Sequence, residues 1–144
     1  MTIEITGNLL RKIQANGEAA YPEEGAGLLL GHVDGDRRQV SAILELTNAR
    51  EDTARHNRYL IIPQDVQQGE LEAERLGLDI IGVFHSHPDH PNQPSEYDRE
   101  WAMVWYSYMI TSIDAGKAAE SRSWKLEEDH SGFEEEKIEL IKLK

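Results

Sequence analysis

The sequence DIIGVFHSHP, residues 79–88, carries the strongest structural signal in the chain. Its first part, Asp79 to Phe84, is apolar on both faces of an extended chain, which predicts a central strand. The strand leads directly into His85, Ser86 and His87. Because side chains two residues apart lie on the same face of a strand, the two histidines are predicted to project together from its end.

On both sides of this strand, the hydrophobic pattern predicts alternating strands and helices. Strands are expected at residues 3–5, 27–31, 40–46, 59–62, 106–113, 121–127 and 133–143. Helices are expected at residues 7–20, 63–76 and 95–104, and a polar loop at residues 47–57. The mixed order of elements favours an α/β or α+β architecture. With no linker or repeat, residues 1–144 are interpreted as a single domain.

Composition excludes several kinds of site. The chain has 144 residues, no cysteine and a formal net charge of -12. Thiol nucleophiles, disulfides and cysteine-ligated metals are therefore excluded, and any metal must be bound by histidine and carboxylate. The sequence contains no basic patch, so we expect no nucleic-acid partner. It also lacks a membrane-spanning apolar run and a signal peptide, so we expect a cytoplasmic protein with no membrane partner.

His85 and His87 offer two imidazole ligands, and Asp98 offers a carboxylate eleven residues after His87 at the start of a predicted helix. Catalytic zinc sites use three protein ligands and leave the fourth position to water. Each feature also has a structural interpretation. The histidines could be hydrogen-bonded or surface residues, and Ser95 with Asp98 forms a helix-capping pattern. The combination favours a metal site, and capping is compatible with it.

A metal-activated water also needs a base, and the pattern His-Glu-x-x-His is absent. Glu23 and Glu24 precede the predicted strand at residues 27–31 and are the best candidates. The alternative is that both are ordinary exposed acids at the junction between a helix and a strand.

Together these residues resemble the signature of the JAMM (MPN-plus) metalloproteases: a glutamate before a Gly-Leu strand, His-x-His, seven residues and Ser-x-x-Asp. Here the positions are Glu24, His85, His87, Ser95 and Asp98, and the resemblance extends over residues 21–113. It implies an MPN domain, a deaminase-like three-layer sandwich around a mixed β-sheet.

The same resemblance implies the role of each residue. His85, His87 and Asp98 would bind one Zn²⁺ per chain. Glu24 would act as general base and acid, and Ser95 would hydrogen-bond the developing oxyanion. The resemblance further implies cleavage of peptide or isopeptide bonds after the C-terminal tail of ubiquitin or a ubiquitin-like protein.

The small size is similar to that of compact prokaryotic members, which implies a ubiquitin-like or sulfur-carrier substrate with a Gly-Gly tail. That tail could add as a strand along a sheet edge. Two alternatives stay open: a non-catalytic MPN scaffold that only binds partners, and a metal-dependent or nuclease-like hydrolase of the DNA-repair branch. The acidic charge and Glu24 argue against the second.

Other aromatic and histidine residues carry weaker signals. Asp89 and His90 lie in the proline-rich loop, so other ligand sets are conceivable. Because His90 does not follow the alternation of the strand, it is better interpreted as a loop residue or as a residue that supports a ligand. His56 is interpreted as a surface histidine. Trp101 and Trp105 would share one face of the predicted helix, mainly for packing, and a homodimer interface there is the alternative.

Overall fold

Strand β4, Asp79–Pro88, lies in the middle of a mixed sheet in the computed structural model, which describes residues 1–46 and 63–142. It pairs antiparallel with β2, Ala26–Asp34, and parallel with β5, Ser107–Asp114. Every residue from 81 to 88 is buried. The predicted central strand is confirmed, and it continues through both histidines instead of ending before them.

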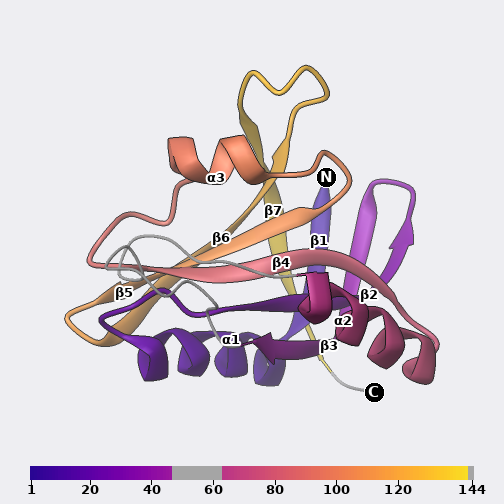
Figure 1. The fold of residues 1–144 in the computed structure, drawn as a ribbon, viewed down its shortest axis with the longest axis horizontal. Coiled ribbons are helices and arrows are strands. Elements are labelled where there is room, and N and C mark those ends of the chain that lie inside the picture. Colours follow the sequence, from indigo (N-terminus) through magenta and orange to yellow (C-terminus); the bar gives the residue numbers. More distant parts are fainter. Residues whose placement is uncertain (47–62, 143–144) are drawn as a thin grey trace.

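The remaining strands extend the sheet on both sides of β4 (Figure 1). They are β1 (Thr2–Thr6), β3 (Arg37–Leu46), β6 (Lys117–Leu126) and β7 (Phe133–Ile141). The order β1-β3-β2-β4-β5-β6-β7 closes on itself, because β1 pairs in parallel with both β3 and β7. The mixed sheet and the α+β class are thus confirmed, whereas the closure through β1 was not expected.

Two helices cover opposite faces of the sheet. Helix α1, Gly7–Ala20, packs into a core cluster that contains Leu29, and helix α2, Pro63–Leu76, packs into a cluster that contains Leu28 and Leu30. Neighbouring residues of β2 point to opposite faces, so the clusters lie on opposite sides of the strand. The predicted layered arrangement and the bounds of both helices are confirmed.

The third helix is shorter than predicted. Helix α3 covers Glu96–Trp101, whereas the sequence pattern predicted a helix to residue 104. Ala102 is extended, with φ −76° and ψ 150°, and the Met103 N–H donates to the Tyr108 hydroxyl at 2.7 Å. This contact with β5 replaces a helical hydrogen bond. The prediction that Trp101 and Trp105 share one helix face is therefore wrong. The predicted strand 59–62, the loop 47–57 and His56 lie outside the described residues.

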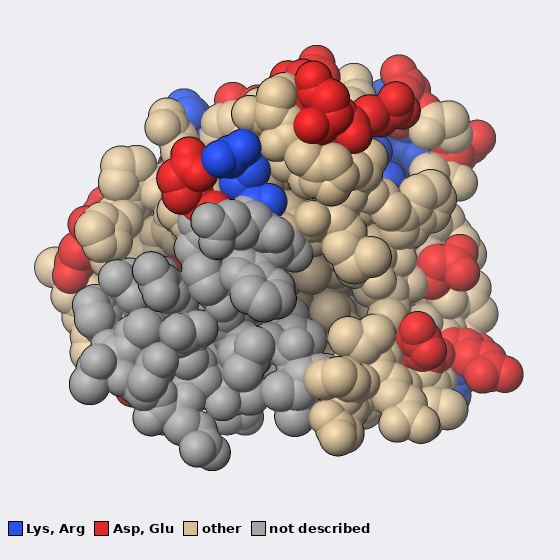
Figure 2. Space-filling model, turned by 45° about the horizontal axis from the view of Figure 1, so that its top comes forward, with Lys and Arg blue, Asp and Glu red and all other residues tan. Residues whose placement is uncertain are grey.

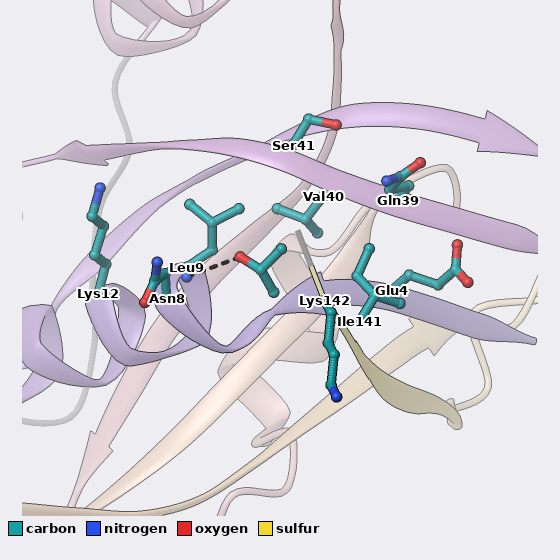
Figure 3. A pocket seen from close by; sticks show the side chains of 10 residues that line it. Glu4, Asn8, Leu9, Lys12, Gln39, Val40, Ser41, Ile141 and Lys142 are labelled. Carbon is teal, nitrogen blue, oxygen red and sulfur yellow. Dashed lines mark hydrogen bonds between the residues drawn. The ribbon is translucent and has the colours of Figure 1, made fainter. Parts of the chain in front are cut away.

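The side chains of β3 and α1 border an open groove of about 750 Å³. The groove opens where β1 stops pairing with β3 after Glu4 and the chain turns into α1 (Figure 3). There the Leu9 N–H donates to the Thr6 hydroxyl at 3.3 Å, which caps the helix. The lining includes Lys12 and Lys142 but none of the five predicted site residues, so this cavity is separate from the candidate site.

Charged side chains are spread over the surface. On the face shown in Figure 2, acidic side chains lie along the upper and right margins, and the basic ones drawn there form no continuous patch. Among the described helices, none is both long and apolar enough to cross a membrane.

One arginine lies inside the fold. Arg38 on β3 is only 4% exposed, and its guanidinium donates to the carbonyls of Ile81 at 2.7 Å and Trp105 at 2.6 Å. The Trp105 ring, which is 57% exposed, packs on this guanidinium at 5.4 Å. Burial lowers the pKa of Arg38, and the charge of Glu136 opposes that shift. Arg38 therefore joins β3 to β4 and to the turn before β5.

We expect Arg38→Met to lower the free energy of unfolding by about 3–5 kcal/mol, because the carbonyls of Ile81 and Trp105 lose their donor and the buried Glu136 loses a nearby positive charge. Urea denaturation would measure the change. Arg37→Met is the matched control. Arg37 is half exposed and contacts Glu4 at 3.5 Å and Glu139 at 3.6 Å, so its loss should cost less than about 1 kcal/mol. Equal effects of the two substitutions would contradict the structural role assigned to Arg38.

Candidate metal centre

The two histidines of β4 converge as the alternation of the strand predicts. Their Nε2 atoms lie 3.2 Å apart, and the rings are 1% and 6% exposed for His85 and His87. The interpretation of these residues as surface histidines is therefore wrong. Two ring nitrogens that face one point from a buried strand form one side of a site for a positive ion.

Asp98 reaches both histidines from the first turn of α3. Its Oδ2 lies 3.2 Å from Nε2 of His87, and its Oδ1 lies 3.4 Å from Nε2 of His85. The same carboxylate accepts the Ser95 N–H at 2.8 Å, while the Asp98 N–H donates to the Ser95 hydroxyl at 3.1 Å. The capping box is thus present, and it orients the carboxylate towards the histidines. Ser95 lies beside Asp98 with an exposed side chain.

The donor set fits a tetrahedral metal ion. Ligand atoms at 2.0–2.1 Å from zinc in tetrahedral geometry are about 3.3 Å apart. The two histidine Nε2 atoms lie 3.2 Å apart, and the Asp98 oxygens lie 3.2 Å and 3.4 Å from them, so all three separations are close to this value. Nδ1 of His87 lies 2.8 Å from the Pro91 carbonyl. Since a carbonyl only accepts, we assign the proton to Nδ1, and Nε2 then presents a lone pair to the Asp98 carboxylate. A cation between these acceptors would satisfy all of them.

The electrostatics of the three groups are strongly coupled. Burial lowers the pKa of His85 below its usual value, although Asp98 opposes the shift. Burial alone would also lower the pKa of His87, but the Asp98 carboxylate, which would accept a hydrogen bond from the protonated ring, and the charge of Glu24 raise it overall. Burial would raise the pKa of Asp98, yet both histidines hold it well below its usual range. Asp98 is therefore a carboxylate here, as a metal ligand must be.

Glu24 also lies at this site, although it is sixty-one residues before His85 in the sequence. It is 3% exposed, and one carboxylate oxygen lies within 4.8 Å of ligand atoms of both His85 and His87. The interpretation of Glu24 as an ordinary exposed acid is therefore wrong. The pairing of β2 with β4 brings these residues together, because Ala26 lies opposite His85.

Sequence reasoning missed the residues that hold the proline-rich loop after β4. The buried Asn92 donates to the Glu120 carbonyl at 2.8 Å, and the Trp124 indole donates to the Asn92 carbonyl at 3.0 Å. Both contacts attach the loop to β6. In both contacts the two residues are distant in the sequence, so no local sequence pattern identifies them. His90 is exposed, and its carbonyl accepts the Ser112 hydroxyl at 3.0 Å.

Asp89 makes a second attachment of the loop. Its carboxylate accepts the Tyr21 hydroxyl at 2.6 Å and the Ala115 N–H at 2.8 Å, at a backbone φ of +57°. These bonds hold the pKa of Asp89 below its usual value. Because Tyr21 lies three residues before Glu24, Asp89 links the loop between the ligands to the segment that carries the glutamate.

Comparisons with known proteins agree with this geometry. Residues 6–127 match the model of the prokaryotic homologs of the JAB domain. A probable TtuB-protein conjugate cleaving protease of Thermus thermophilus is 29% identical over 118 residues, 82% of this chain and 75% of that protein. A desampylase of Haloferax volcanii is 34% identical over 100 residues, 68% of each chain. A solution structure from Desulfitobacterium hafniense has a TM-score of 0.86 at 29% identity and covers 98% of this chain and 94% of its own.

Proposed function

Because the chain belongs to the family of prokaryotic homologs of the JAB domain, we propose that it is a zinc-dependent protease. Its proposed reaction is hydrolysis of the peptide or isopeptide bond after the C-terminal tail of a ubiquitin-like or sulfur-carrier protein. The observation that carries this proposal is the convergence of Glu24, His85, His87 and Asp98 in one buried cluster. The names of the Thermus and Haloferax relatives support a protein conjugate as the substrate.

Three residues would hold the zinc: His85, His87 and Asp98. A zinc ion bound there would lower the pKa of a water molecule to about 7 and polarise the scissile carbonyl. We assign Asp98 as the third ligand because its oxygens lie 3.2 Å and 3.4 Å from the histidine Nε2 atoms. Glu24, which is buried beside the two histidines, is assigned as the general base.

The other groups move protons and stabilise charge. Glu24 would accept a proton from the attacking water and give it to the leaving amine as the carbon–nitrogen bond breaks. The products are a carboxylate on the tail and a free amine. The Ser95 hydroxyl accepts from the Asp98 N–H but keeps its own proton. It could therefore donate that proton to the carbonyl oxygen as negative charge develops there.

The proposal includes the setting in which the enzyme works. The family match over residues 6–127 and the closed set of strands support one domain over residues 1–144. We also propose that the substrate ends in a Gly-Gly tail. The enzyme is proposed to work in the cytoplasm and to form a homodimer. The alternative of a non-catalytic scaffold predicts that some site residues are missing, but all five signature residues are present in this sequence.

Metal content and cleavage test the proposed function together. We expect the purified chain to contain one zinc per molecule by elemental analysis. We also expect it to cleave a fusion in which a ubiquitin-like protein ending in Gly-Gly is joined to a fluorescent protein. Chelation should abolish cleavage, and added zinc should restore it. A chain that binds zinc but cleaves no such fusion would favour the scaffold, and a chain that binds no metal would exclude the zinc enzyme.

A further inference from the structure

Ser86 connects the strand of the histidines to the segment of the glutamate. It lies between His85 and His87, is 3% exposed, and points to the opposite face of β4 from the two rings. The Gly25 N–H donates to the Ser86 hydroxyl at 2.8 Å, and the Ser86 N–H donates to the Gly25 carbonyl at 3.1 Å. Gly25 directly follows Glu24, so two hydrogen bonds hold the backbone beside the glutamate.

These two bonds replace the last step of the β2–β4 ladder. The regular ladder ends where Ala26 lies opposite His85. In a hydrogen-bonded antiparallel pair the two residues exchange two backbone bonds. Between Gly25 and Ser86 one of them is made by the serine hydroxyl instead of a carbonyl. The chain can thus leave the ladder at Gly25, next to the residue that faces the metal centre, without losing a buried donor.

Helix α1 closes the space behind this contact. A Cβ atom on Gly17 would lie 2.9 Å from Cβ of Ser86, and a Cβ atom on Gly25 would lie 2.4 Å from Oδ1 of Asn16. Ser86 and Gly25 are therefore both in close contact with the helix. The hydroxyl has little room to move away from the Gly25 N–H, so the position of the segment before β2 is narrowly defined.

We propose that Ser86 is a positioning residue that sets the placement of the Glu24 carboxylate relative to His85 and His87. The inference rests on the proposed function, in which Glu24 transfers a proton. A general base must lie about 2.6–3.2 Å from the proton's donor atom. A displacement of about 1 Å can lower the rate by roughly 10²-fold. Loss of the Ser86 hydroxyl leaves the Gly25 N–H without its acceptor and releases the segment that holds Glu24.

The first test separates kcat from KM and from metal binding. In Ser86→Ala we expect one zinc per chain, a KM within about twofold of the wild type and a kcat lower by roughly 10²-fold on the Gly-Gly fusion. Ser86→Cys keeps an acceptor at this position, although sulfur is larger than oxygen and accepts more weakly, so its kcat should lie between those of the wild type and Ser86→Ala. Wild-type kcat in folded Ser86→Ala, or in Ser86→Cys if Ser86→Ala does not fold, would overturn the proposal.

Ser123→Ala is the matched control. Ser123 is a fully buried serine on β6, which is separated from β4 by β5, and its hydroxyl donates to Glu136 at 2.7 Å. Its loss should lower the melting temperature as the loss of Ser86 does, while kcat stays at the wild-type value. An equal loss of kcat in both variants would mean that any buried serine bond has this effect, and the positioning role would be wrong.

Hydrogen exchange tests the contact without any substrate. In the zinc-loaded wild type the Gly25 amide should exchange slowly by NMR, and in Ser86→Ala or Ser86→Cys it should exchange at least about tenfold faster. Unchanged exchange in both variants would overturn the inference. If the wild type cleaves no fusion, the proposed function fails, but the Gly25 exchange still decides whether Ser86 holds the segment.

Discussion

Glu24→Gln is expected to lower the rate of cleavage strongly while the chain keeps one zinc. Glutamine has nearly the same shape as glutamate but cannot accept the proton of the attacking water. General acid–base catalysis contributes about 10²–10⁴-fold, so kcat should fall by that factor. Glu24 is buried beside His85 and His87, and in this proposal it does not ligate the metal. Elemental analysis and single-turnover cleavage of the Gly-Gly fusion would measure the two quantities.

Glu23→Gln is the control for this substitution, since it makes the same chemical change one residue earlier. Its activity should stay close to that of the wild type. If Glu24→Gln loses zinc together with activity, Glu24 is a metal ligand and the assignment of Asp98 as the third ligand needs revision. If Glu24→Gln remains fully active, the base lies elsewhere.

Asp98→Asn is expected to remove the metal without removing the helix cap. An asparagine at this position can still accept the Ser95 N–H, which now bonds Asp98 Oδ2 at 2.8 Å, and can still donate its own N–H to the Ser95 hydroxyl. It loses the negative charge that would help to bind the metal ion between the two histidines. We expect zinc content well below one per chain and activity below roughly 1% of the wild type, because the Lewis-acid chemistry is lost.

The control for Asp98→Asn lies in the same turn of α3. Glu96 is exposed and pairs with Arg99 at 2.6 Å, so Glu96→Gln changes an acid of the first turn without touching the metal centre. It should keep its zinc and its activity. Full zinc occupancy in Asp98→Asn would show instead that Asp98 is only a capping residue, as its Ser-x-x-Asp pattern allows.

Local patterns predicted the parts of the site that are close together in the sequence. The convergence of His85 and His87 follows from strand alternation alone, and the cap between Ser95 and Asp98 follows from their spacing. The bounds of α1 and α2 are equally local, because apolar periodicity and Pro63 define them.

Contacts between distant segments could not be predicted in this way. The burial of Glu24 depends on the pairing of Ala26 with His85, and the early end of α3 depends on the Tyr108 hydroxyl. Neither contact can be predicted from the spacing of residues in the sequence. The resemblance to a known family supplied the role of Glu24, but it did not supply the bonds of Ser86 to Gly25. Those bonds became visible only in three dimensions.

The closure of the sheet through β1 has a consequence for the order of events during synthesis. Residues 2–6 are made before the other strands of the sheet, yet the pairing of β1 with β7 must wait until residues 137–141 are available. Such long-range pairing slows folding, because the entropy of a long loop is lost before the contact forms. The strands β2 and β4 and helix α3, which carry the candidate site, all precede that last strand. The metal centre can therefore assemble before β1 pairs with β7.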